Sequence, residues 1–185
     1  MLPPEIWRRY RKLDLTAIIA SVLAWALLTG LINWPNTVST FYLSLFLTAV
    51  FISFIALLIR KIGAVMLFSI LGALISLPIN NLGGLGIYKI AALGVAGLVF
   101  ETVFVLVRLE FKSIPIDLIL ASALSFFSIP FTMALFVPSA KGLVPYLWNF
   151  ALSALLIGVM GAVAAFLIWY RISGLHAVIK FEYEV

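Results

Sequence analysis

Six long runs of apolar residues follow one another along the chain, with short polar breaks between them. They cover roughly residues 15–32, 38–59, 62–78, 86–107, 115–137 and 146–170. A helix needs about 20 apolar residues to cross the hydrocarbon core of a bilayer, and each run is close to that length. The runs do not alternate between apolar and polar positions, as the strands of a membrane barrel would. The pattern therefore predicts an all-α integral membrane protein, a bundle of six transmembrane helices.

The polar breaks consist of turn-forming residues and charges, which sets the expected organisation of the chain. Only Arg60 and Lys61 separate the second apolar run from the third. The helices predicted for these two runs should therefore form a tight antiparallel hairpin. We expect three parts: a basic cytoplasmic or interfacial leader at 1–14, a transmembrane domain at 15–170 and a cytoplasmic tail at 171–185. The tail ends in alternating apolar and charged residues, which is typical of a strand that docks on a partner or of a frayed end.

Composition supports this interpretation and excludes several classes of function. Hydrophobic residues make up 65% of the 185 residues and charged residues only 10%, with a mean hydropathy of +1.24. A soluble domain carries about 25% charged residues, so a soluble enzyme and a nucleic-acid-binding domain are both excluded. The chain has no cysteine and a single histidine, His176, so we expect no metal site, no cofactor and no thiol or triad chemistry. It also lacks a phosphate-binding loop, so it is predicted not to be an enzyme and not to hydrolyse ATP itself.

The basic residues are distributed very unevenly between the two sides of the predicted bundle. Ten of the twelve lie in the leader, the second and fourth loops and the tail, all on one side. Only Lys89 and Lys141 fall on the other side. Loops rich in Lys and Arg stay on the cytoplasmic side of a membrane, so both termini are predicted to be cytoplasmic. The expected location is the plasma membrane, in a multi-pass topology.

Glu101 is the only acidic residue well inside an apolar run. A carboxylate at that depth is unfavourable by several kcal/mol unless it is paired, solvated or neutralised. At 100° per residue it shares a helix face with Gly94 and Gly97, so it should point into the bundle, where small residues allow close packing. Two interpretations remain open. Glu101 either contacts a ligand or carries a proton, or it is a structural carboxylate bonded to a neighbouring helix or to Arg108.

A second set of candidate residues falls in or beside the predicted external loops. Asparagines and aromatic side chains that meet at one end of a bundle can bind a small, flat, polar molecule by stacking and amide hydrogen bonds. The candidates for substrate binding, besides Glu101, are Trp34, Asn80, Asn81, Tyr88, Trp148 and Asn149. For any one of them, the ordinary aromatic belt of a membrane protein or turn chemistry is a competing explanation.

Small residues form two patches on the predicted helices. Ala20 and Ala24 make an A-x-x-x-A pattern in the first helix, with Ala17 on the same stretch. Gly158 and Gly161 begin a similar patch in the sixth helix. Such patches let helices pack backbone to backbone, either inside the bundle or against a partner protein.

Residues 60–108 carry a resemblance to a known family. The motifs that carry it are residues 60–64 (RKIGA), 71–74 (LGAL), 80–84 (NNLGG) and 94–104 (GVAGLVFETVF). They resemble the substrate-binding S components of energy-coupling factor (ECF) transporters, in particular the branch that handles thiamine or its hydroxymethylpyrimidine precursor. The short length and the six predicted helices are also similar to that family.

This resemblance implies a vitamin-capture subunit of an ABC-type importer. Its partners would be a transmembrane T component, two cytoplasmic ATPase subunits and the lipid bilayer, with a small-molecule substrate and no nucleic acid. The resemblance assigns the partner interface to Ala17, Ala20 and Ala24, and it aligns Glu101 with the carboxylate of the family's glycine-rich stretch. The alternative is a non-transporting scaffold or assembly subunit of a larger membrane complex, in which Glu101 is a structural lock.

Overall fold

A computed structural model describes residues 10–34, 37–79, 86–107, 110–111, 114–136 and 145–173. Six helices account for most of these residues: α1 (Lys12–Ile32), α2 (Val38–Ile59), α3 (Ala64–Ile75), α4 (Tyr88–Val107), α5 (Ile116–Phe136) and α6 (Leu147–Ile172). Between α4 and α5, the two-residue strands β1 (Glu110–Phe111) and β2 (Ile114–Pro115) pair antiparallel. The predicted all-helical fold is thus confirmed for the described part, apart from this small hairpin.

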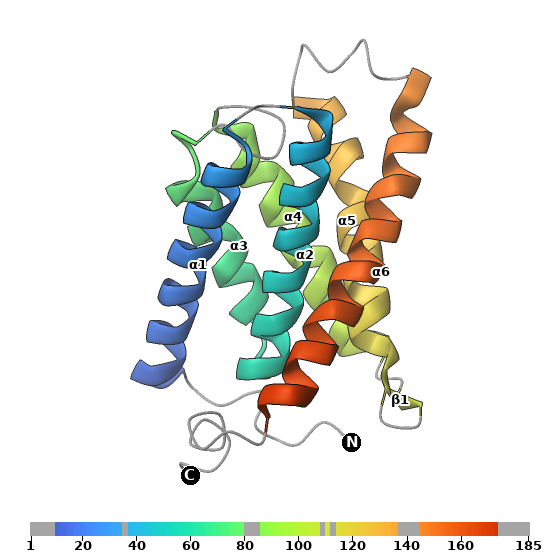
Figure 1. The fold of residues 1–185 in the computed structure, drawn as a ribbon. Coiled ribbons are helices and arrows are strands. Elements are labelled where there is room, and N and C mark those ends of the chain that lie inside the picture. The colour runs from blue at the N-terminus through green and yellow to red at the C-terminus, as the bar shows by residue number, and fades with distance from the viewer. Residues whose placement is uncertain are drawn as a thin grey trace.

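The helices run alternately up and down, and α2 lies at the centre of the bundle (Figure 1). α2 contacts α1, α3, α5 and α6, while α4 packs between α3 and α5. α1 stands at the edge of the bundle and packs chiefly on α3 and α2. The start of α1 and the end of α6 lie at the same end of the bundle, the lower end in Figure 1.

Five of the six helices are long and apolar enough to cross a membrane. α3 is the exception, because its 12 residues span only about 18 Å at 1.5 Å per residue, against about 30 Å of hydrocarbon. The apolar run at 62–78 suggested a sixth spanning helix, but Gly63 precedes the helix and Ser76 ends it in a turn. The structure supports a multi-pass membrane protein; the sixth crossing and the side on which the termini lie stay predictions.

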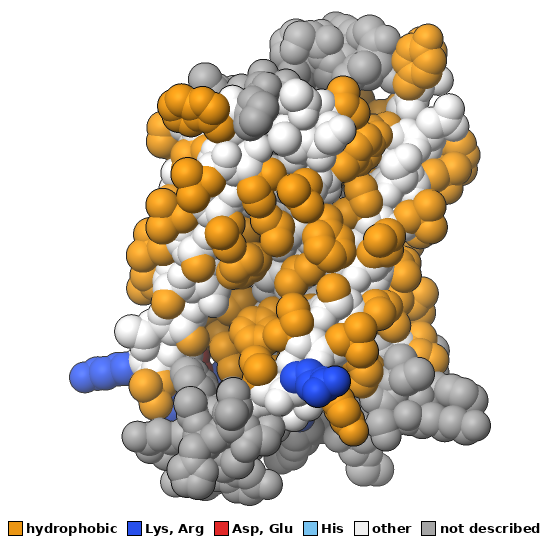
Figure 2. Space-filling model, in the orientation of Figure 1, with side chains coloured by type: hydrophobic (Ala, Val, Ile, Leu, Met, Phe, Trp, Pro, Cys, Tyr) orange, Lys and Arg blue, Asp and Glu red, His pale blue; other side chains and the backbone are white. Residues whose placement is uncertain are grey.

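The bundle surface is apolar over most of its height. On the face shown in Figure 2, hydrophobic side chains cover the helices, and the visible Lys and Arg side chains lie at the lower end. Leu31, Leu106 and Leu135 expose 71%, 76% and 82% of their surface. Exposed leucines of this kind over a whole bundle are expected of a surface that faces lipid, and they mark an interaction surface in a soluble protein.

Small residues bring the helices close together inside the bundle. A Cβ built on Gly161 of α6 would lie 2.3 Å from the Cβ of Ala49 in α2, and one on Gly158 would lie 2.7 Å from the carbonyl oxygen of Ser122 in α5. The predicted close packing of the sixth helix is therefore confirmed. In the other half of the bundle, Trp25 of α1 is fully buried, and its ring fits over Gly72 of α3.

The helix boundaries differ from the predicted domain limits at the start of the bundle. α1 begins at Lys12, inside the stretch predicted as leader, because the Asp14 side chain in its first turn accepts a hydrogen bond from the Arg11 amide at the N-cap. The strand predicted at the end of the chain falls on residues outside the described ranges.

Candidate functional site: a charged clamp on the short helix

Glu101 of α4 binds the N-terminus of α3. Its Oε2 accepts a hydrogen bond from the Gly63 amide at 2.9 Å, and its Oε1 accepts one from the Met66 amide at 3.0 Å. The first amides of a helix have no partner within the helix, and the dipole there favours a negative charge. Gly63, the N-cap residue of α3, has no side chain that could accept these hydrogen bonds. The Glu101 carboxylate of the neighbouring helix α4 accepts them instead.

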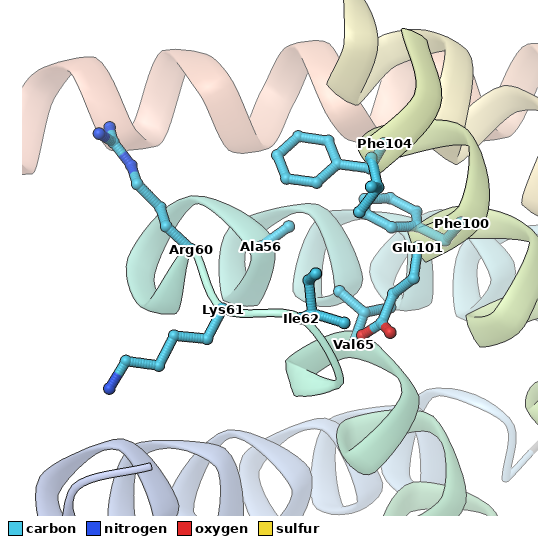
Figure 3. A pocket seen from close by; sticks show the side chains of 9 residues that line it. Ala56, Arg60, Lys61, Ile62, Val65, Phe100, Glu101 and Phe104 are labelled. Atoms are coloured by element: carbon cyan, nitrogen blue, oxygen red, sulfur yellow. The ribbon is translucent and has the colours of Figure 1, made fainter. Parts of the chain in front are cut away.

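The turn between α2 and α3 has a shape that presents these amides to α4. Arg60 ends α2 in the left-handed region with φ 49°, and Gly63 follows with φ 90°. A glycine adopts this conformation without strain, whereas a β-carbon would disfavour it. A Cβ at Gly63 would also lie 2.9 Å from the Tyr10 hydroxyl oxygen, so a larger residue would clash with Tyr10. Figure 3 shows the Glu101 carboxylate pointing at the turn, while Lys61 and Arg60 point away from it.

Three side chains anchor the same turn to the start of α1. Lys61 forms an ion pair with Asp14, and the two side chains are only 6% and 3% exposed. The Tyr10 hydroxyl donates a 2.6 Å hydrogen bond to the Ile62 carbonyl oxygen, and the Lys61 ammonium lies 5.9 Å from the centre of the Tyr10 ring. Burial, followed by the negative charges of Glu101 and Asp14, raises the pKa of Tyr10 to about 12.

Lys89 binds the opposite end of α3. It lies in the first turn of α4, is 1% exposed, and its ammonium donates hydrogen bonds to the carbonyl oxygens of Ser76 and Ile79. The carbonyls at a helix C-terminus lack partners within the helix and carry the negative end of the dipole. Two charged residues of α4 therefore hold the two ends of α3, and we call Glu101 and Lys89 the α3 clamp.

The sequence singled out Glu101 but not the function of Lys89. On a helical wheel the two residues lie about 120° apart, and Lys89 falls beside a predicted external loop, where a lysine is typical of a membrane interface. The short length of α3 explains the position of Lys89, but the apolar run at 62–78 does not reveal that length. A helix that ends inside the apolar part of a bundle needs a donor for its last carbonyls.

Two spaces adjoin the Glu101 carboxylate. One is a narrow cavity between α2, α3 and α4, which Phe100 and Phe104 help to line, with about 20 Å³ of free space (Figure 3). That is enough for about one water molecule. The other is an open groove between α3 and α4, with about 300 Å³ of free space, whose walls include Met66 and Leu98.

The predicted external residues lie at the other end of the bundle from Glu101. Trp34, just after α1, is 88% exposed, and Trp148, at the start of α6, is 61% exposed. Asn149 is exposed and Tyr88 is half-buried. Trp148 packs edge-on against Phe127 of α5, with ring centres 5.7 Å apart. Asn80 and Asn81 lie outside the described residues, so a single site formed by this set stays a prediction.

The predicted partner patch lies on the outer side of α1. Ala20 and Ala24 are exposed and Ala17 is half-buried, while Ile18 and Val22 are fully buried on the opposite side. Within the described residues, no group of three or more metal-ligating side chains occurs.

Comparison of the chain with family models, with curated proteins and with solved structures finds no match.

Proposed function

We propose that this protein is the substrate-binding subunit of an ECF-type importer for a small vitamin or vitamin precursor, of the thiamine or hydroxymethylpyrimidine type. It would lie in the plasma membrane with both termini in the cytoplasm. A transmembrane T component and cytoplasmic ATPase subunits would supply the energy, because the chain carries no phosphate-binding loop.

The observation that carries this proposal is the position of Ala20 and Ala24. Both are exposed on α1, the helix at the edge of the bundle, so neither is buried by the part of the chain that the structure describes. Side chains this small leave a shallow strip in which a partner helix can approach the backbone. This supports a docking surface for the T component.

The substrate site is proposed at the opposite end from Glu101, where Trp34, Tyr88, Trp148 and Asn149 lie. The sequence adds Asn80 and Asn81 as candidates for the same site. Aromatic faces and amides suit a flat heterocycle with hydrogen-bonding edges. Glu101 lies at the α2–α3 turn, so in this proposal it holds α3 in place and does not touch the substrate.

Mass spectrometry of small molecules released from the purified protein tests the substrate. We expect a thiamine-like or pyrimidine-like compound that rebinds at micromolar concentration, and Trp34→Ala together with Trp148→Ala should weaken that binding. If no such ligand is released and none binds on titration, the proposal fails.

A double variant, Ala20→Leu with Ala24→Leu, tests the docking surface separately. Transport and capture of the T component should be lost, while ligand binding remains. Gly94→Leu on α4 is the matched control, because a Cβ there meets nothing within 4 Å, and it should leave both properties unchanged. If the double variant loses ligand binding and capture of the T component to the same extent, the assignment of Ala20 and Ala24 to a docking surface is wrong.

A second candidate, a scaffold subunit that transports nothing, is favoured by the way the bundle uses its charges. Glu101, Lys89, Asp14 and Lys61 all join one helix to another in the described residues. Charges used in this way stabilise a rigid body without forming a ligand site. Absence of ligand combined with stable capture of membrane partners would favour this candidate.

A further inference from the structure

The groove between α3 and α4 opens from Glu101 towards the outside of the bundle. Ile62 and Met66 form one wall, and Leu98, Thr102 and Leu106 of α4 form the other. Leu98 and Leu106 are 53% and 76% exposed, so the groove opens on the apolar surface of the bundle. In a membrane this surface faces lipid, so the acyl chains of lipids contact the groove.

A half-buried carboxylate borders this otherwise apolar groove. The Glu101 oxygens accept hydrogen bonds from the Gly63 and Met66 amides, and the Val65 amide also bonds to this carboxylate. A carboxylate offers about four acceptor positions, so one remains for a further donor. No cationic side chain is paired with Glu101 among the residues that the structure describes.

Several charged side chains lie near Glu101 at the end of the bundle. Glu101 contacts the turn that carries Arg60 and Lys61, and Asp14 pairs with Lys61 at the same level. Charged side chains gather at the boundary between hydrocarbon and headgroups, because burying them deeper is unfavourable. A lipid whose chain lies in the groove therefore has its headgroup within reach of Glu101.

We propose that this groove is a binding site for an aminophospholipid of the leaflet at that end of the bundle. One acyl chain lies between α3 and α4, and the primary ammonium of the headgroup donates hydrogen bonds to Glu101. A primary ammonium combines positive charge with N–H donors, which makes its hydrogen bonds to a carboxylate strong. A choline headgroup has the charge but no donor, and a glycerol headgroup leaves the lipid anionic, which Glu101 repels. This site is independent of the transported substrate.

Competition among lipids with identical acyl chains tests the headgroup. The protein is placed in nanodiscs of equal parts phosphatidylethanolamine, phosphatidylcholine and phosphatidylglycerol, and the lipids that remain bound are counted by native mass spectrometry. The ethanolamine lipid should be retained about tenfold over the choline lipid, as one charge-assisted hydrogen bond predicts. Glu101→Gln should abolish this preference. No preference in the wild type, a preference for the glycerol lipid, or a preference that survives Glu101→Gln would each overturn the proposal.

A second variant keeps the test decisive if Glu101→Gln does not fold. Leu98→Trp fills the groove without touching the Glu101 hydrogen bonds, and it should lower retention of the ethanolamine lipid about tenfold. Leu156→Trp on α6, a residue that is 61% exposed, is the matched control and should change nothing. Unchanged lipid retention in Leu98→Trp would refute the site.

Discussion

Replacing Glu101 by alanine should destabilise the start of α3 more than any other part of the bundle. The change removes the acceptors of two amide hydrogen bonds, from Gly63 and Met66. A hydrogen bond to a charged group contributes about 1.5–3 kcal/mol, and the lower figure applies because Glu101 is only half-buried. The expected loss is therefore about 3 kcal/mol for alanine and about half of that for glutamine, which keeps one acceptor oxygen.

Two measurements check this expectation. Thermal unfolding in detergent, followed by tryptophan fluorescence, should show a Tm about 6–12 °C lower for Glu101→Ala, at about 2–4 °C per kcal/mol. Hydrogen exchange of the Gly63 and Met66 amides should become about 100-fold faster. Thr102→Val is the matched control, because among the described residues that exposed hydroxyl bonds to the Leu98 carbonyl of its own helix and not to α3. If exchange at these two amides is unchanged in Glu101→Ala, the carboxylate is not the cap of α3.

Three further predictions concern the packing and the charges around the clamp. Lys61→Met should cost about 3 kcal/mol in detergent unfolding, because the buried Asp14 carboxylate then retains as its charge partner the more distant Arg11, at 3.9 Å. Lys12→Met at an exposed site should cost less than about 0.5 kcal/mol. Gly161→Ala should cost about 1–3 kcal/mol by forcing α2 and α6 apart, whereas Gly94→Ala, with open space around it, should be neutral or stabilising by less than about 1 kcal/mol. The pKa of Tyr10 is raised to about 12, so the folded state holds this proton more tightly and stability should fall as the pH rises from 10 to 12. Tyr10→Phe should remove that part of the pH dependence, and a tyrosinate absorbance titration should lose one group of high pKa.

The sequence predicted the helices well because their signal is local. Each apolar run is bounded by residues that end helices, such as Asn33 after the first run and Arg60 after the second, and the helices stop there. The apolar run at 62–78 is longer than the helix that it contains, because apolar residues such as Leu77 extend the run whether or not they are helical. The length of α3 depends on contacts with α4, which lie far away in the chain.

The candidate site was predictable only in part for the same reason. Glu101 stood out because a lone carboxylate in an apolar run needs a partner, and of the two interpretations the bond to a neighbouring helix is the one that the structure contains. The partner is backbone, so no pattern of side chains in the sequence reveals it. Lys89 looked like a residue at the membrane interface, and only the position of the Ser76 carbonyl shows that it is a buried donor.

The spacing of the clamp accounts for the length of α3. Glu101 and Lys89 are twelve positions apart on α4, which is about 18 Å of helix, and the twelve residues of α3 span the same distance. Because α3 and α4 are antiparallel, the acid meets the positive end of the α3 dipole and the base meets the negative end. The reverse order along α4 would place both charges at the wrong ends. A short helix can therefore end within an apolar bundle, since its neighbour supplies the hydrogen-bond partners that lipid cannot.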